Sequence, residues 1–507
     1  MESAVQYLLL ALALASVQIS YTESRLNEKR RDKTERRFYS NQIKDNICDI
    51  ADRDSKVHCY CENTEEKTAT RADCWVFNGG IDKSDPLWAS FNTQPFLERL
   101  TFNVRSNGAL KFIPLQVIKR LKRLQKLYIH YADLGKIEKK TFSNMSAVRE
   151  IILMHDNITE LDFSSFTNLP SLVNLTIKEN KVTEIQRDVF VDLSSLRYLD
   201  LSFNSINLAH DGCFEHLTIL NDLILEANSI TILTRDTFRG LANLTRLDLR
   251  SNKLSMIGDL TFTELWNLNE LLLDNNKLKY LSERAFDGLV LLQKLSMTGN
   301  KLKSINEGLL EGVRGLELLD LRNNEIEHFT YENVKPIIDN LKMKTSVLYL
   351  SGNKLMCDCH ISWIKVLRNE TTSDILQAAL DDITCIPNYS EDYETNSVTE
   401  YDASPKTVSE VVTSTMVHQI NNDEQLEGTN QALKTDPTVE PFIKEQLPIV
   451  NMPSGALLCS REMVQNKEDS LMLKSIGKVL WGGNASSKLR VYSSLVLKLL
   501  FLLAILK

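Results

Sequence analysis

The chain of 507 residues lacks the motifs of common hydrolase and nucleotide sites. It has no H-E-x-x-H pair, no G-x-S-x-G turn and no glycine loop that could hold a phosphate. Its eight histidines are scattered without metal-ligand spacing, and we expect His130 and His155, near Asp156, to be solvated. We therefore expect no enzyme activity, no cofactor and no metal.

Positive charge is also scarce. There are 59 Lys and Arg against 67 Asp and Glu, which gives a net charge of −8. No basic stripe stands out, so the chain lacks the phosphate-neutralising surface that a nucleic-acid partner requires. The basic run at residues 25–37 is expected to be a solvated arm, with a processing site or a heparin-like contact as the alternative.

Neither end of the chain carries an apolar run long enough to span a bilayer. Residues 4–15 are apolar and are followed by small residues, which predicts a cleaved secretory signal. The last apolar run is interrupted by Lys498 and falls short of the roughly 30 Å hydrocarbon core. Small residues and a polar spacer precede it, so we expect a glycosylphosphatidylinositol anchor signal, attached at Gly483 or Asn484, rather than a short membrane span.

What the chain does have is an internal period of 24 residues. Phenylalanine recurs in this period at Phe142, Phe166, Phe190, Phe214, Phe238, Phe262 and Phe286. Asparagine keeps the same period at Asn180, Asn204, Asn228, Asn252, Asn276, Asn300 and Asn324. Such a period predicts stacked repeats, because one unit cannot bury its apolar side chains alone.

Each unit contains a short alternating strand. In residues 243–252 the leucines point inward and the charged residues between them point outward. The asparagine that follows can bond neighbouring turns, since its carboxamide has both donors and an acceptor. Asp156 and Ala132 replace it in two early units, and we expect a looser turn at Ala132.

The unit L-x-x-L-x-L-x-x-N-x-L, as in residues 244–254, resembles the leucine-rich repeat. This resemblance implies an α/β repeat fold: a horseshoe solenoid with parallel strands on the concave face, irregular or short helical segments on the convex side, and cysteine-rich caps at both ends. It covers about half of the chain. The whole organisation is similar to cell-surface adhesion and recognition proteins of this family, particularly insect connectin- and chaoptin-like molecules.

Nine cysteines behind a secretory signal favour an oxidising compartment. They lie mostly on either side of the repeats. The resemblance implies the front pairs Cys48 with Cys61 and Cys59 with Cys74, and it implies that Trp363 closes the last coil. Cys357 with Cys385 is the expected rear bond. For Cys359 three alternatives are open: a bond to Cys459, a free thiol, or a bond to a second molecule. Cys213 is expected to be a buried thiol.

We expect the following organisation: a signal peptide (1–20), a basic arm (21–47), an N-terminal cap (48–99), about eleven repeats (100–355), a C-terminal cap (356–389), an acidic stalk (390–460), a membrane-proximal segment (461–485) and an anchor-signal tail (486–507). Glycosylation sequons, typical of an exported chain, occur at Asn144, Asn157, Asn174, Asn243, Asn369, Asn388 and Asn484. Asn174 projects from the strand face, where a glycan would obstruct binding.

The outward strand positions are the candidate binding surface, because rigid strands fix their side chains. The hypothesis names Tyr128, Tyr131, Ile152, Met154, Tyr198, Ile224, Arg246 and Arg250. Aromatic and apolar anchors beside mixed charges suit a protein partner, although packing between units is the simpler explanation. The resemblance implies cell adhesion through a partner on a cell surface or in the matrix, with a homodimer included. The alternative is a secreted structural or carrier subunit, or an innate immune recognition factor, that docks an effector.

Overall fold

The computed structural model describes residues 46–50, 54–387 and 446–452, and it divides into two compact units. The first comprises the chain up to Leu355 together with His360–Thr384. The second comprises Met356–Cys359 and the chain from Cys385 onward. The expected signal peptide, basic arm, stalk and anchor tail lie almost wholly outside the described residues.

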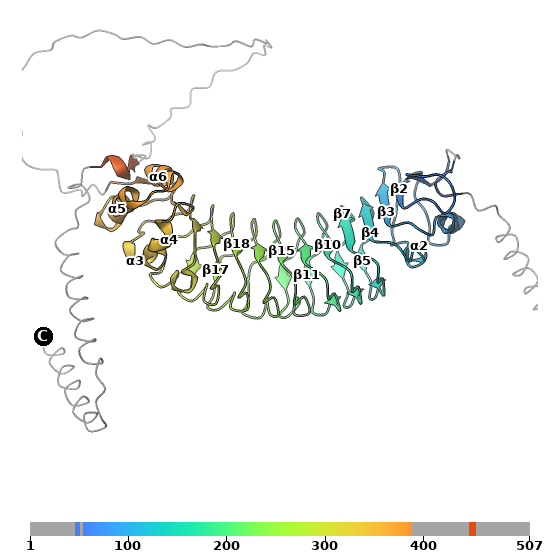
Figure 1. Ribbon diagram of the computed structural model, residues 1–507, viewed down its shortest axis with the longest axis horizontal. Coiled ribbons are helices and arrows are strands. Elements are labelled where there is room, and N and C mark those ends of the chain that lie inside the picture. The colour runs from blue at the N-terminus through green and yellow to red at the C-terminus, as the bar shows by residue number, and fades with distance from the viewer. Residues whose placement is uncertain (1–45, 51–53, 388–445, 453–507) are drawn as a thin grey trace, which may run out of the picture. The chain divides into compact units, whose positions relative to one another are not determined.

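The first unit is built on one sheet of 13 strands. In spatial order these are β1 (Val57–Cys61), β2 (Arg71–Val76), β3 (Arg99–Val104), β4 (Lys126–His130), β7 (Glu150–Met154), β10 (Asn174–Thr176), β13 (Tyr198–Asp200), β15 (Asp222–Ile224), β16 (Arg246–Asp248), β18 (Glu270–Leu272), β20 (Lys294–Ser296), β21 (Leu318–Asp320) and β22 (Val347–Tyr349). Only the β1–β2 pair is antiparallel. The strands line the concave side of an arc (Figure 1).

The 24-residue period sets the register of this sheet. Leu175 of β10 lies opposite Ile151 of β7 and Leu199 of β13, so equivalent positions of successive repeats form straight columns. The inward leucines of these columns are fully buried. A parallel stack of coils follows, which is the predicted solenoid.

Short strands on the other side of several coils pair with one another in sheets of two or three. They are β5 (Lys136–Ile137), β6 (Phe142–Ser143), β8 (Glu160–Leu161), β9 (Phe166–Thr167), β11 (Glu184–Ile185), β12 (Phe190–Val191), β14 (Leu208–Ala209), β17 (Met256–Ile257) and β19 (Tyr280–Leu281). The seven periodic phenylalanines are at most 1% exposed, and neighbouring rings such as Phe142 and Phe166 lie 5.0 Å apart. They fill the core behind the leucines.

The asparagines form a hydrogen-bonded ladder inside the coil. The amide of Asn252 donates to the carbonyls of Leu225 (2.9 Å) and Leu249 (3.1 Å), and its oxygen accepts from the backbone of Ile230 (3.0 Å). These bonds join consecutive turns and satisfy backbone groups that would otherwise be buried without partners.

The backbone of the turn at Ala132 is bonded to the next repeat. Its backbone N–H donates to the Asp156 carboxylate at 2.9 Å, and Leu134 donates to the Asp156 carbonyl at 2.9 Å. The alanine itself makes none of the side-chain bonds that the asparagines donate to carbonyls in later turns, so the looser turn expected there stays a prediction.

Both ends of the first unit are closed by other elements. At the N-terminal end, the disulfides Cys48–Cys61 and Cys59–Cys74 hold the β1–β2 hairpin, in the pairing that the resemblance implies. The 3-10 helix η1 (Pro86–Thr93) connects β2 to β3, and its Trp88 meets Phe102 edge to face at 6.0 Å.

At the other end, short helices replace the open loops. They are η2 (Glu311–Val313), α3 (Tyr331–Val334), η3 (Lys335–Ile337), α4 (Ile338–Leu341), α5 (Trp363–Glu370) and α6 (Asp374–Asp381); α2 (Leu115–Ile118) lies earlier in the chain. Trp363 is buried, and its indole donates to the Phe329 carbonyl at 3.1 Å. Among the described residues, none of the helices combines the length and apolar character that crossing a membrane demands.

The second unit is held by the Cys357–Cys385 disulfide and by a bridge between Met356 and Ile386. Its other described elements are η4 (Cys359–Ile361) and β23 (Thr384–Cys385), which both straddle the unit boundary, with β24 (Leu447–Pro448) and η5 (Ile449–Asn451). Cys359 is disulfide-bonded as well. In the first unit Cys213 is a free, buried thiol whose pKa is raised by desolvation.

Candidate functional site

The outward side chains of the main sheet form three columns across the concave face. The candidate residues Tyr128, Ile152, Met154, Tyr198 and Ile224 all lie in these columns, and each is partly exposed. They belong to β4, β7, β13 and β15, so they form one region over the N-terminal half of the sheet. Alternation along short strands is enough to place them there.

Several charged side chains of this face already form ion pairs with one another. Asp248 lies at an outward position of its strand, as expected, but its carboxylate is buried beneath two arginines. Arg250 donates to it at 2.7 Å and also reaches Glu226 at 3.2 Å, while Arg246 lies 3.2 Å from Glu270. Because long side chains cover a short one between them, Arg246 and Arg250 are ordered parts of an ion-pair network.

A fourth row of side chains borders the columns. It consists, in each repeat, of the residue just before the ladder asparagine or before the residue that replaces it. All ten backbones there are left-handed, with φ between 54° and 74°: Tyr131, His155, Glu179, Phe203, Ala227, Ser251, Asn275, Gly299, Asn323 and Gly352. A left-handed residue with a side chain is strained by roughly 1–2 kcal/mol, least for Asn and not at all for Gly. The later repeats use small residues or Asn at this row, whereas the first four use large side chains.

The neighbouring repeat fixes the strained conformation. Phe203 donates its N–H to the Glu226 carbonyl at 2.9 Å, and Tyr131 donates to Met154 at 3.2 Å. A backbone held in this way presents its side chain rigidly.

The four large side chains, here named the edge row (Tyr131, His155, Glu179 and Phe203), form a connected surface. The Tyr131 and His155 rings stack at 4.8 Å with 7° between their planes. The imidazole Nε2 lies 2.8 Å from a Glu179 carboxylate oxygen, and the Lys178 amine sits 4.9 Å from the Phe203 ring centre. Tyr131 is 61% exposed and Phe203 46% exposed, so the edge row offers aromatic area to solvent.

Aromatic side chains deeper in the face are more constrained. The Tyr128 hydroxyl donates to Glu150 at 2.6 Å, and desolvation together with that carboxylate raises the pKa of Tyr128 to about 12. Desolvation, aided by Asp200, likewise raises the pKa of Tyr198 to about 12. Burial, with a smaller effect from His155, lowers the pKa of His130 below its ordinary value. These groups stay neutral at physiological pH.

Metal chemistry gains little support from the first unit. On the side opposite the concave sheet, Asp188, Glu215 and His216 come close enough to share an ion, but His216 is already 3.1 Å from the Asp188 carboxylate. All three are at least partly exposed, and such groups are ordinarily solvated ion pairs.

The sequons differ in their surroundings. Asn144, Asn243 and Asn369 are exposed, whereas Asn157 and Asn174 are partly buried. Asn174 lies on β10 and hydrogen-bonds Glu150 through its side chain. Asn388, Asn484, Gly483 and Cys459 lie outside the described residues.

Three overlapping segments of the chain match the family described as leucine rich repeat: 146–206, 199–254 and 242–302. The solenoid is built of leucine-rich repeats. Over 115 residues the chain is 38% identical to connectin of Drosophila melanogaster. That stretch is 22% of this chain and 17% of connectin, so the match spans less than a fifth of the relative's length.

Solved structures with leucine-rich repeats also match. An internalin, inlF of Listeria monocytogenes, is 19% identical with a TM-score of 0.43, covering 64% of this chain and 87% of its own. A chain of an octameric complex of Latrophilin 3, Unc5D and FLRT2 is 22% identical with a TM-score of 0.40, covering 52% of this chain and 85% of its own.

Two features of the leucine-rich repeat domain escaped prediction. Nothing in the alternation indicates that the residue before the asparagine is left-handed, although Gly299, Gly352 and Asn323 at that position are a compositional hint. The second feature is a local cluster of four cations within one turn, at residues 119–123. The run K-R-L-K-R was the available signal.

Proposed function

We propose that the chain is an extracellular recognition protein that binds a protein partner through the N-terminal half of the concave face. The observation that carries this proposal is the edge row, where four consecutive repeats hold large side chains in strained left-handed conformations. The later repeats manage the same turn with small residues or asparagine, so the fold does not require these side chains. Binding is a reason to keep them.

The chemistry of the edge row suits a protein partner. Tyr131 and Phe203 supply rigid exposed rings, and Glu179 supplies charge between them. Aromatic anchors surrounded by polar groups dominate protein interfaces. The half-buried residues Tyr128 and Ile152 extend the apolar area inward.

The narrower version of the proposal is adhesion between cells, with a second copy of the chain as partner and attachment through a lipid anchor at Gly483 or Asn484. The resemblance to connectin supports adhesion, and the C-terminal composition supports the anchor. A carrier subunit joined to an effector through Cys359 is less favoured, because that cysteine is already disulfide-bonded.

The test replaces Tyr131 and Phe203 together by asparagine, the residue that the chain itself uses in this row at Asn275 and Asn323. Asparagine tolerates the left-handed backbone, so the double variant should fold and remove only the rings. Cells in suspension that express the parent protein should aggregate. In a screen against a panel of surface proteins, the soluble ectodomain of the parent should bind at least one of them. We expect the double variant to lose at least about tenfold in affinity, as for loss of a hot spot.

Ser251→Asn is the matched control, since it makes the same kind of change in the same row outside the edge row. It should bind as the parent does. Binding that survives the double variant unchanged would refute the concave-face proposal. Release of the protein from cells by a phosphatidylinositol-specific phospholipase tests the anchor separately, and retention on the cells would contradict it.

A further inference from the structure

A cluster of cations follows α2 on the flank of the solenoid. Lys119, Arg120, Lys122 and Arg123 occupy one turn and all are exposed. The two arginines have local contacts: Arg120 donates to the Asn92 side chain at 3.3 Å, and Arg123 lies over the Phe96 ring at 4.5 Å. Among the described residues, neither lysine has an ion-pair partner within 4.0 Å.

On the C-terminal side of this cluster, the neighbouring turns offer no acidic group to neutralise it. Repeats place residues 24 positions apart side by side, so the neighbours of residues 119–123 are residues 143–147 and then 167–171. Those two segments contain serine, asparagine, threonine, proline and apolar residues, and no Asp or Glu. The flank therefore combines uncompensated positive charge with hydroxyl and amide groups, on a chain whose net charge is −8.

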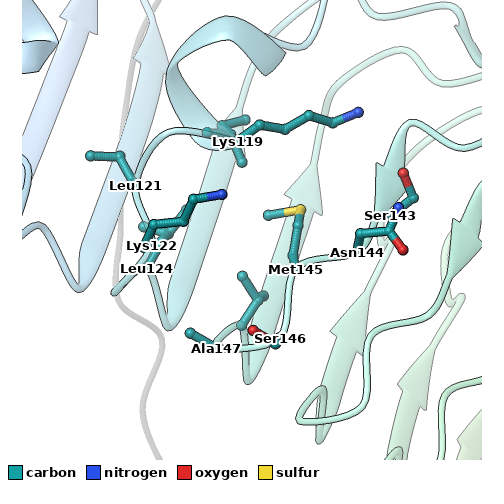
Figure 2. A pocket seen from close by; sticks show the side chains of 11 residues that line it. Lys119, Leu121, Lys122, Leu124, Ser143, Asn144, Met145, Ser146 and Ala147 are labelled. Atoms are coloured by element: carbon teal, nitrogen blue, oxygen red, sulfur yellow. The ribbon is translucent and has the colours of Figure 1, made fainter.

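A depression of about 240 Å³ lies between the two turns. Lys119 and Lys122 extend from one wall toward the facing turn, which carries Ser143, Asn144 and Met145 (Figure 2). Its volume equals that of about eight liquid water molecules, which is room for one sulfated sugar ring.

We infer that this flank binds a sulfated polysaccharide. The lysine amines would meet sulfate groups, and the serine and asparagine side chains would bond sugar hydroxyls. A linear polyanion gains affinity by releasing its condensed counterions to such cations. Single-stranded nucleic acid would need free aromatic platforms for its bases, and Phe96 in this region is already covered by Arg123.

This site goes beyond the proposed function, since it uses a flank and not the concave face. It would let the protein gather on matrix or cell-surface polysaccharide while the edge row stays open to its partner. If an experiment refutes binding at one of these two surfaces, the proposal for the other surface is unaffected.

The test uses the full chain on a heparin column eluted with increasing sodium chloride. Lys119→Gln/Lys122→Gln should elute at clearly lower salt than the parent. Each lysine that displaces counterions adds roughly 0.7–0.9 to the slope of log affinity against log salt, so the double variant should lose about 1.5 from that slope. Lys119→Arg/Lys122→Arg should restore it, because the charge returns.

The matched control is Lys253→Gln/Lys277→Gln, which removes two equally exposed lysines from another part of the same domain. Its elution should equal that of the parent, including after enzymatic removal of any glycan at Asn144. Equal elution of the Lys119/Lys122 variant and the parent, or an equal shift in the control, would overturn the inference. So would competition by poly-glutamate or single-stranded RNA as effective as that by heparin oligosaccharide, since either would assign the flank to another class of partner.

Discussion

Asp156 occupies a ladder position that the next eight repeats fill with asparagine. One carboxylate oxygen accepts from Ala132 at 2.9 Å, but the other is buried without a hydrogen-bond partner among the described residues. At the following position the Asn180 amide donates to carbonyls of Leu153 and Lys178 at 3.0 Å. An ionised aspartate cannot make the donations that the asparagine amide makes, and desolvation raises the pKa of Asp156 to about 8.

Substitution of Asp156 by asparagine should therefore stabilise the domain at alkaline pH. The folded-state pKa lies above the unfolded value of about 3.9. Between these values the folded state binds more protons, so the parent loses stability as pH rises from about 4 to 8. The variant restores the missing donor and should gain about 1–3 kcal/mol at pH 8.5, with a much smaller gain at pH 4.5. Thermal unfolding of both proteins at the two pH values measures the difference.

The reciprocal change, Asn180→Asp, is the control for this argument. It should lower the unfolding temperature and introduce the same pH dependence one repeat later. A stability gain for Asp156→Asn that does not depend on pH would mean that the unpaired carboxylate is not its cause.

At the scale of elements, disulfides hold the segments on either side of the repeats, and the partner of Cys359 is still to be assigned. Cys359 is disulfide-bonded, the six cysteines of the three described bonds are used, and Cys213 is free. Of the nine cysteines in the chain, Cys459 remains. We predict the bond Cys359–Cys459.

Peptide mapping by mass spectrometry without reduction should recover these two cysteines in one linked pair of peptides. Cys213 should resist alkylation until the protein is denatured, because it is buried and its raised pKa keeps it a thiol. Alkylation of Cys359 in the native protein, or a dimer dispersed by reduction, would contradict the pairing.

The elements also show what the sequence could and could not predict. Strict periodicity predicted the parallel sheet, the phenylalanine core and the outward columns, since each depends only on spacing. The left-handed edge row depends on the backbone torsion of one residue per repeat. The pattern of apolar and polar side chains does not predict that torsion. The burial of Asp248 under Arg246 and Arg250 depends on how long side chains fold over a neighbour, and the pocket beside Lys122 depends on the gap between two turns.

For the whole molecule, a glycan at Asn174 is incompatible with partner binding on the concave face. This residue lies on β10 between Glu150 of β7 and Tyr198 of β13, and its side chain is partly buried in a hydrogen bond to Glu150. A glycan there would break that bond and cover the middle of the proposed binding region. Asn144, Asn243 and Asn369 are exposed and lie outside the main sheet.

We therefore predict that the secreted protein carries glycans at Asn243 and Asn369 and none at Asn174. Site-resolved glycan mass spectrometry measures this occupancy directly. Asn174→Gln should leave the electrophoretic mobility unchanged, because it removes no sugar. Asn243→Gln, the matched control, should increase mobility without affecting binding. High occupancy at Asn174 would place a large polar chain amid Tyr198 and Ile152, and partner binding would then have to move to the convex side or a flank.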